Sequence, residues 1–150
     1  MKNRVETPLH GILRIWWPWL LTCTPTQQML EARRALVVAS DPAVAERLVA
    51  WLSAEGHLPE VCASFSEAKP ALDARPPDLL VTELKLGAYN GLHLALRMKY
   101  RQPGVRTIVV GEADRLFERE AQRHAATYAA WPMENDQFVR MMRAMLPDPR

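Results

Sequence analysis

Short apolar runs alternate with amphipathic segments along most of this chain, and this alternation limits the possible folds more than any other feature. Apolar residues between the runs recur at helical spacing. Strands that alternate with helices in this way are typical of βα units on a parallel sheet. The sequence therefore predicts an α/β fold with five βα units and no internal repeat. The expected strands are 35–39, 61–63, 79–83, 107–110 and 127–130.

The first expected helix has signals at both of its ends. Pro42 suits the first turn of a helix, and the side chain of Ser40 or Asp41 can cap that turn. Of the two, Asp41 is the preferred cap. Gly56 is expected to end the helix.

The second and third helices are predicted from similar patterns. A capping box at 64–67 opens the second helix, and Pro70 is expected to shorten or kink it. The third helix follows a turn at 87–91, and its apolar residues leave Arg97 and Lys99 pointing outward.

The last two helices are expected from about Asp114 to Arg123 and near the end of the chain. The final helix carries a stripe of methionines, and such a stripe is more often core than a binding groove. Met141 and Met145 are therefore predicted core residues, whereas the environment of Met142 stays open.

The charge pattern disfavours nucleic-acid binding. The formal net charge is +2, but acidic residues are interleaved with basic ones in the globular part of the chain. Cys23 and Cys62 have no metal-ligand spacing and are too few for a disulfide framework, which favours a reducing cytoplasm. The four histidines share no spacing suited to a metal. We predict no metal and no other cofactor.

The chain is long enough for one domain, expected at 29–150 after an apolar N-terminal extension at 1–28. The most apolar stretch is 11–21, which is interrupted by Arg14 and is shorter than the about 20 residues that span a bilayer. Three interpretations stay open: a disordered extension upstream of an alternative start at Met29, a segment that packs on the domain or on a second copy, and a membrane-surface or export segment.

Four strings, in their order and spacing, resemble the receiver domain of two-component response regulators. They are ALVVASDP at 35–42, PDLLVTEL at 77–84, Asn-Gly at 90–91 and YAAWP at 128–132. The resemblance covers about 34–147. It implies a flavodoxin-like sheet with strand order 2-1-3-4-5, helices on both faces, and a site at the carboxyl ends of the strands.

The resemblance also implies which residues would occupy the phosphorylation site. In that family, two acids after the first strand and an acceptor aspartate after the third strand hold Mg²⁺ during phosphoryl transfer. Here the metal-binding positions fall on Ala39 and Ser40, with Asp41 one residue further on, and the acceptor position falls on Glu83. The longer stem of Glu83 makes it a poor acceptor, because small misplacements are costly in rate.

The positions that respond to phosphorylation in the family differ as well. Gly111 stands at the position of a hydroxyl residue, and Trp131 stands at the position of a conserved lysine of the family's site. Tyr128 matches the family's aromatic switch, and with Gly111 beside it we expect one fixed orientation. The Trp131-Pro132 bond is expected to be cis. Glu83 either mimics a phosphorylated state or is simply solvated, and the solvated state is favoured.

We therefore expect a stand-alone pseudo-receiver, a phosphorylation-independent signalling or regulatory protein that is not an enzyme. Its partner would be a protein, such as a histidine kinase or an output protein, with a second copy of the chain as an alternative. Contact is expected through Tyr128, Arg119 and Met133. One alternative is an atypical receiver that binds Mg²⁺ or accepts phosphate at Glu83. Another is a membrane-surface adaptor that uses residues 11–21.

Overall fold

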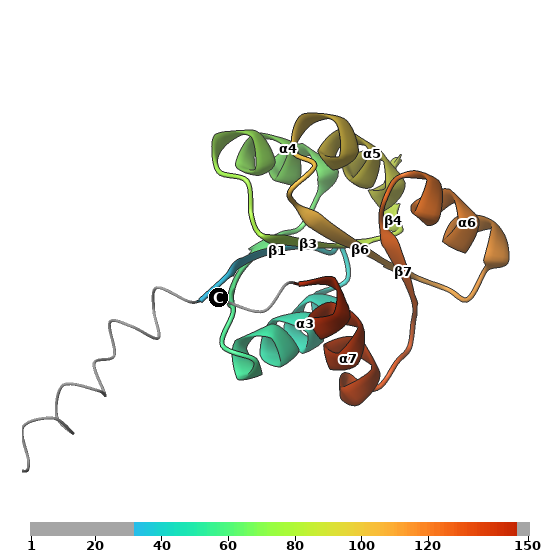
Figure 1. The fold of residues 1–150 in the computed structure, drawn as a ribbon. Helices are drawn as coiled ribbons and strands as arrows, with labels where there is room; N and C mark the ends of the chain where they lie inside the picture. Colours follow the sequence, from blue (N-terminus) through green and yellow to red (C-terminus); the bar gives the residue numbers. More distant parts are fainter. Residues whose placement is uncertain (1–31, 147–150) are drawn as a thin grey trace, which may run out of the picture. The chain divides into compact units, whose positions relative to one another are not determined.

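A five-stranded parallel sheet forms the centre of the domain in the computed structural model, which describes residues 32–146 (Figure 1). The strand order is β2-β1-β3-β6-β7, which is the predicted flavodoxin-like order. All four strand pairs are parallel. The strands are β1 (Arg34–Val38), β2 (Leu58–Cys62), β3 (Leu79–Glu83), β6 (Arg106–Gly111) and β7 (Thr127–Ala130).

Helices cover both faces of this sheet, as expected. Figure 1 shows α3 (Pro42–Ala54) and α7 (Asn135–Met145) on one face. The opposite face carries α4 (Phe65–Ala74), α5 (Gly91–Arg101) and α6 (Arg115–Arg123). The central strands are buried on both sides, because Val37 packs in the α3–α7 core while its neighbour Val38 packs in the α4–α5 core. This explains their continuous apolar sequence.

The topology places a crevice where the strand order reverses. From β1 the chain crosses to β2 through α3, and it then returns to pair β3 with the other side of β1. Ligands of open α/β sheets bind outside the carboxyl ends of the strands at this kind of reversal. The residues that follow β1 and β3 are therefore the first to examine for a site.

The ends of α3 follow the expected pattern. Asp41 caps the helix, because its Oδ1 accepts a hydrogen bond of 2.9 Å from the backbone N–H of Ala43. Pro42 occupies the first turn. The helix ends at Ala54, and Gly56 just beyond it has a φ of 81°, a left-handed conformation that glycine adopts readily.

Strand β2 begins earlier than predicted, at Leu58 instead of residue 61. The alternation of apolar and polar residues was weak here, because β2 is an edge strand. Its residues are mostly exposed and do not alternate between buried and exposed positions. Leu58 donates its N–H to the carbonyl of Arg33, so Pro59 faces the open edge. A proline at that place removes no hydrogen bond from the sheet.

The expected shortening of α4 at Pro70 was wrong, because the helix continues through Pro70 to Ala74. Proline lacks the N–H that would bond to the carbonyl of Ser66. Both Pro70 and Ser66 are exposed, so water can satisfy that carbonyl. Half of the predicted capping box is present, since Ser64 accepts from the N–H of Glu67, whereas the Glu67 carboxylate accepts from the N–H of Ala63 and not from that of Ser64.

The predicted turn at 87–91 is part of a small antiparallel hairpin that the sequence did not reveal. It consists of β4 (Lys85–Leu86) and β5 (Tyr89–Asn90). Gly87 begins the two-residue loop with a φ of 63°. The ring of Tyr89 stacks on Phe65 of α4 with 4.5 Å between the ring centroids, which attaches the hairpin to the helix layer.

Arg97 and two methionines of α7 lie elsewhere than predicted, and the environment of Met142, which the sequence left open, is the core. Arg97 does not point outward, because its Nη2 contacts both carboxylate oxygens of Asp73 on α4 at 2.6 and 2.7 Å. The hydrogen bond from Arg97 is the main reason that the pKa of Asp73 lies below its usual value. In α7, Met142 is the buried methionine at 1% exposure, whereas Met141 and Met145 are partly buried at the edge of the core.

The predicted division of the chain at residue 28 stays a prediction. A compact unit begins at Arg33, but residues 11–21 and Met29 lie outside the described residues. Between residues 32 and 146, no helix has the length and apolar character needed to cross a membrane.

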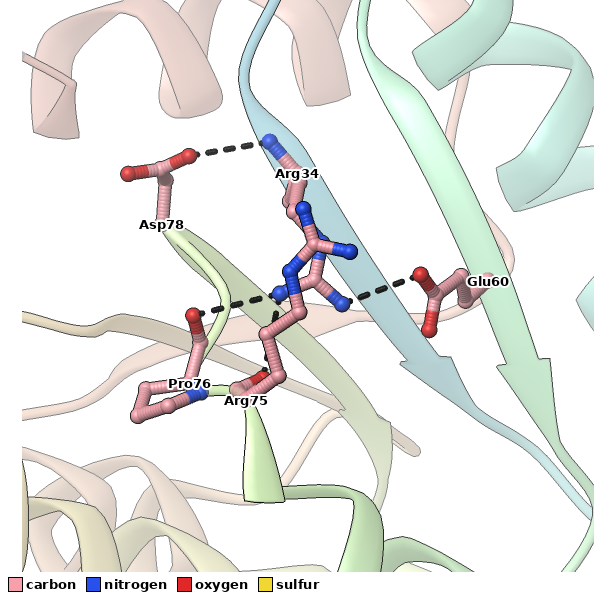
Figure 2. A network of polar contacts seen from close by, with 5 residues as sticks. All are labelled: Arg34, Glu60, Arg75, Pro76 and Asp78. Carbon is pink, nitrogen blue, oxygen red and sulfur yellow. Dashed lines mark hydrogen bonds and ion pairs between the residues drawn. The ribbon is translucent and has the colours of Figure 1, made fainter. Parts of the chain in front are cut away.

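Arg34 ties three segments together at the amino ends of the strands (Figure 2). Its guanidinium donates to Glu60 on β2 at 2.9 Å and to the backbone carbonyls of Arg75 and Pro76 at 3.1 and 3.5 Å. Its backbone N–H donates to the carboxylate of Asp78 at 2.9 Å. The side chain of Arg34 is only 19% exposed, whereas the residues that accept its hydrogen bonds lie at the surface.

Replacing Arg34 with methionine should lower the free energy of unfolding by about 1–3 kcal/mol, because the hydrogen bonds of a largely buried guanidinium to Glu60 and to two backbone carbonyls are lost. Arg106→Met is the matched control, since Arg106 is exposed and should change stability by no more than about 0.5 kcal/mol. Urea unfolding of both variants measures the difference, and equal losses would contradict the role given to Arg34.

Candidate functional site

Glu83 links the end of β3 to the loop that follows β1. Its Oε2 accepts hydrogen bonds from the N–H of Ser40 at 2.7 Å, the hydroxyl of Ser40 at 3.0 Å and the N–H of Asp41 at 3.3 Å. The extra methylene of glutamate lets the carboxylate reach across the crevice between β1 and β3. The expectation that Glu83 is simply solvated was therefore wrong.

The other residues of the predicted acidic pocket offer no metal site. Ala39 is 3% exposed and packs in the α3–α7 core. Ser40 binds Glu83, and Asp41 caps α3. No group of three or more His, Cys, Asp or Glu side chains between residues 32 and 146 is placed to hold a metal ion. The donor set therefore does not fit the Mg²⁺ site that the family resemblance implies.

Gly111 and Tyr128 are sterically complementary. A Cβ atom at Gly111 would lie 2.6 Å from the Tyr128 hydroxyl and 2.8 Å from the Cβ of Leu84. The hydroxyl donates to the backbone carbonyl of Glu112 at 2.5 Å. Burial raises the pKa of the Tyr128 phenol, with smaller contributions from the charges of Asp114 and Glu112. The Tyr128 hydroxyl thus occupies space that a side chain at position 111 would need.

Trp131 is half-buried and packs toward the helices on the α3–α7 face. Its ring centroid is 5.6 Å from that of Trp51, and the guanidinium of Arg47 lies 5.5 Å from it. The backbone N–H of Trp131 donates to the carbonyl of Gly111 at 2.7 Å. The bond between Trp131 and Pro132 is cis, as predicted.

A pocket of about 200 Å³ lies at the carboxyl ends of the central strands. Two of its charged residues were missed by the sequence analysis: Lys85, which follows β3, and Glu112, which follows β6. Their side chains form an exposed ion pair at 3.1 Å. Their places directly after two strands were the only signal that could have identified them. The lining residues are Asp41, Val44, Glu83, Leu84, Lys85, Val110, Gly111, Glu112 and Trp131.

The predicted contact residues do not form one cluster. Arg119 is exposed on α6, and Tyr128 lines a second hollow beside the start of that helix. Met133 is half-buried against the α3–α7 core on the other face of the sheet. Leu116, on the first turn of α6, is 72% exposed and was not predicted.

Comparisons with known proteins agree with this architecture. Over 78 residues the chain is 32% identical to the photosynthetic apparatus regulatory protein RegA of Cereibacter sphaeroides, covering 52% of this chain and 42% of that protein. It is 25% identical over 112 residues to the TorCAD operon transcriptional regulatory protein TorR of Escherichia coli O157:H7, covering 74% and 49%. The chain thus spans less than half the length of these two curated relatives.

Among solved structures, the receiver domain of NtrX from Brucella abortus matches with a TM-score of 0.70 and 21% identity, covering 77% of this chain and 99% of that domain. No family model matches the chain. The strand order and the likeness to the NtrX domain show that the chain has the fold of a receiver domain, and in sequence it is similar to two regulatory proteins. Such domains are regulatory signalling modules.

Changing Gly111 to alanine should lower the free energy of unfolding by about 1–3 kcal/mol, because the added methyl group meets both Tyr128 and Leu84 at less than contact distance. Gly104→Ala is the matched control, since nothing lies within 4 Å of a Cβ there. Urea unfolding measures both. An equal effect at the two glycines would contradict the steric coupling.

Part of this loss should disappear in a Tyr128→Phe background, where the hydroxyl that meets the new methyl group is absent. The remaining contact with Leu84 should keep the loss above zero. A loss of the same size in both backgrounds would show that the Tyr128 hydroxyl does not limit position 111.

Proposed function

We propose that this receiver domain is a phosphorylation-independent regulatory module that works by protein–protein contact. The observation that carries the proposal is the binding of the Glu83 carboxylate by the N–H groups of Ser40 and Asp41. In this arrangement a built-in negative charge takes up donors next to the acceptor position. A phosphoryl group would have to compete with that carboxylate for them.

Charge compensation for a phosphoryl group is also weak at this site. Phosphoryl transfer needs cations to neutralise the charge that develops on the transferred group. The chain offers Ala39 and Ser40 at the implied metal-binding positions and Trp131 at the implied lysine position. Lys85 is the one cation among the lining residues of the pocket, which also carry the carboxylates of Asp41, Glu83 and Glu112.

The alternative of Mg²⁺ binding or phosphate acceptance at Glu83 has less support. Asp41 would have to give up its helix cap, which typically stabilises a protein by about 1 kcal/mol. Oε2 of Glu83 already accepts three hydrogen bonds from the chain itself, so that oxygen is not available to Mg²⁺ or phosphate without their loss. The membrane-surface alternative rests on residues 11–21, which lie outside the described residues.

We propose α6 and β7 as the main contact face, with Arg119 and Tyr128 taking part. Leu116 supports this assignment, because a large apolar side chain that is 72% exposed on α6 suits a protein interface. Met133 belongs to the proposal only at its margin, since it packs against the opposite core. A histidine kinase or an output protein stays the proposed partner, and a second copy of the chain stays the alternative.

Action without an attached output domain and a cytoplasmic location stay predictions from the sequence. The chain spans less than half of RegA and TorR, so the activities of those whole proteins are not transferred to it.

A ¹H–¹⁵N NMR titration of the full chain with Mg²⁺, and then with Mg²⁺ plus beryllofluoride as a phosphoryl mimic, should leave the amides of Ser40, Glu83 and Gly111 unshifted. The reason is that Glu83 already occupies the donors beside the acceptor position. Saturable shifts at these amides in the native chain would overturn the proposal.

The double variant Ser40→Asp/Glu83→Asp provides the matched comparison. It restores two short carboxylates at the positions where the family resemblance implies them and removes the long stem of Glu83. Mg²⁺-dependent shifts are expected near residues 40 and 83 in this variant, because closely placed carboxylates are suitable ligands for Mg²⁺. Such shifts would show that the native chain fails to respond to Mg²⁺ because of the residues at positions 40 and 83.

A further inference from the structure

The pocket at the strand ends carries an excess of negative charge. Asp41, Glu83 and Glu112 line it, and Lys85 is the single cation among its lining residues. The N–H groups that could hold an anion there already bind Glu83. We propose that this pocket receives a lysine or arginine side chain of a partner protein; this rests on the proposed function, because it names the partner chemistry of the same site.

The size and walls of the pocket suit one long side chain. Its volume of about 200 Å³ is below the roughly 300–1,000 Å³ of sites for drug-sized molecules. Four apolar side chains form the walls, and a basic side chain has an aliphatic stem that packs on such walls while its charged head stays near acceptors. The apolar wall residues are Val44, Leu84, Val110 and Trp131.

The acceptors for the charged head are available. In the described residues, 32–146, every hydrogen bond to the Glu83 carboxylate goes to Oε2, which leaves Oε1 for a ligand. The ion pair between Lys85 and Glu112 is 74% and 82% exposed, and exposed pairs are weak enough to exchange partners readily. Glu112 can therefore turn toward an incoming cation.

Trp131 adds a second reason to expect a cation. Aromatic rings attract cations held over their faces, and tryptophan does so most strongly. The guanidinium of Arg47, which does not line the pocket, already lies 5.5 Å from this ring. The family's lysine position is thus filled by a residue that suits a cation supplied from outside.

The test is a ¹H–¹⁵N NMR titration of the full chain with the blocked tripeptide acetyl-Gly-Lys-Gly-amide, and with its arginine counterpart. The amide of Gly111 and the indole N–H of Trp131 should shift and saturate at millimolar peptide. The same tripeptide with norleucine, which keeps the stem but lacks the charge, should produce no saturable shift at these two groups.

The double variant Asp41→Asn/Glu112→Gln should raise the Kd of the lysine peptide about tenfold, which corresponds to about 1.4 kcal/mol. Asparagine caps helices as well as aspartate does, so α3 should keep its start while the pocket loses two charges. Glu46→Gln is the matched control, because it removes a charge from an exposed position of α3 outside the pocket and should leave the Kd unchanged.

Three results would overturn the inference: no shift with either basic peptide, equal shifts with norleucine, or displacement of the peptide by Mg²⁺ at equal concentration. None of these depends on the beryllofluoride titration. If neither the basic peptides nor beryllofluoride shift any amide signal, only this inference is rejected. If beryllofluoride shifts the signals, the proposed function is rejected.

Discussion

The arrangement of the candidate site depends on the carboxylate of Glu83. Because this side chain crosses the crevice and accepts three hydrogen bonds from Ser40 and Asp41, the loop after β1 is fixed against the end of β3. The carboxylate also satisfies N–H groups at the start of α3, where negative charge is favoured. Trp131, which also lines the pocket, packs against Trp51.

Gly111 and Tyr128 depend on each other in the same way. The tyrosine hydroxyl takes the space beside Gly111 and donates to the carbonyl of Glu112, so a side chain at position 111 would have to displace it. A Cβ atom at position 111 would meet both Tyr128 and Leu84, so the end of β6 is closely packed on this side of the pocket.

The sequence predicted the elements whose signals are local or strongly periodic. Caps such as Asp41 and the buried central strands follow from residue types alone, and the parallel order of the sheet followed from the family resemblance. It failed where tertiary contacts decide. Arg97 turns inward because Asp73 is on the neighbouring helix. Met141 and Met145 were predicted as core residues but lie at the edge of the core. The reach of Glu83 could not be predicted either, because it depends on donors from a distant loop.

The ligand preference of the pocket follows from the same contact of Glu83 with the loop after β1. A receiver site that is built for a phosphoryl group must present cations and free N–H donors to an anion. Once Glu83 has taken those donors, the remaining side chains present carboxylates, an aromatic ring and apolar walls, and the favourable ligand changes from an anion to a cation with an aliphatic stem. Two lining residues of the pocket are close in sequence to the proposed contact face: Trp131 directly follows β7, and Glu112 lies between β6 and α6. A partner that lies on that face can therefore place a basic side chain in the pocket without any change in the fold.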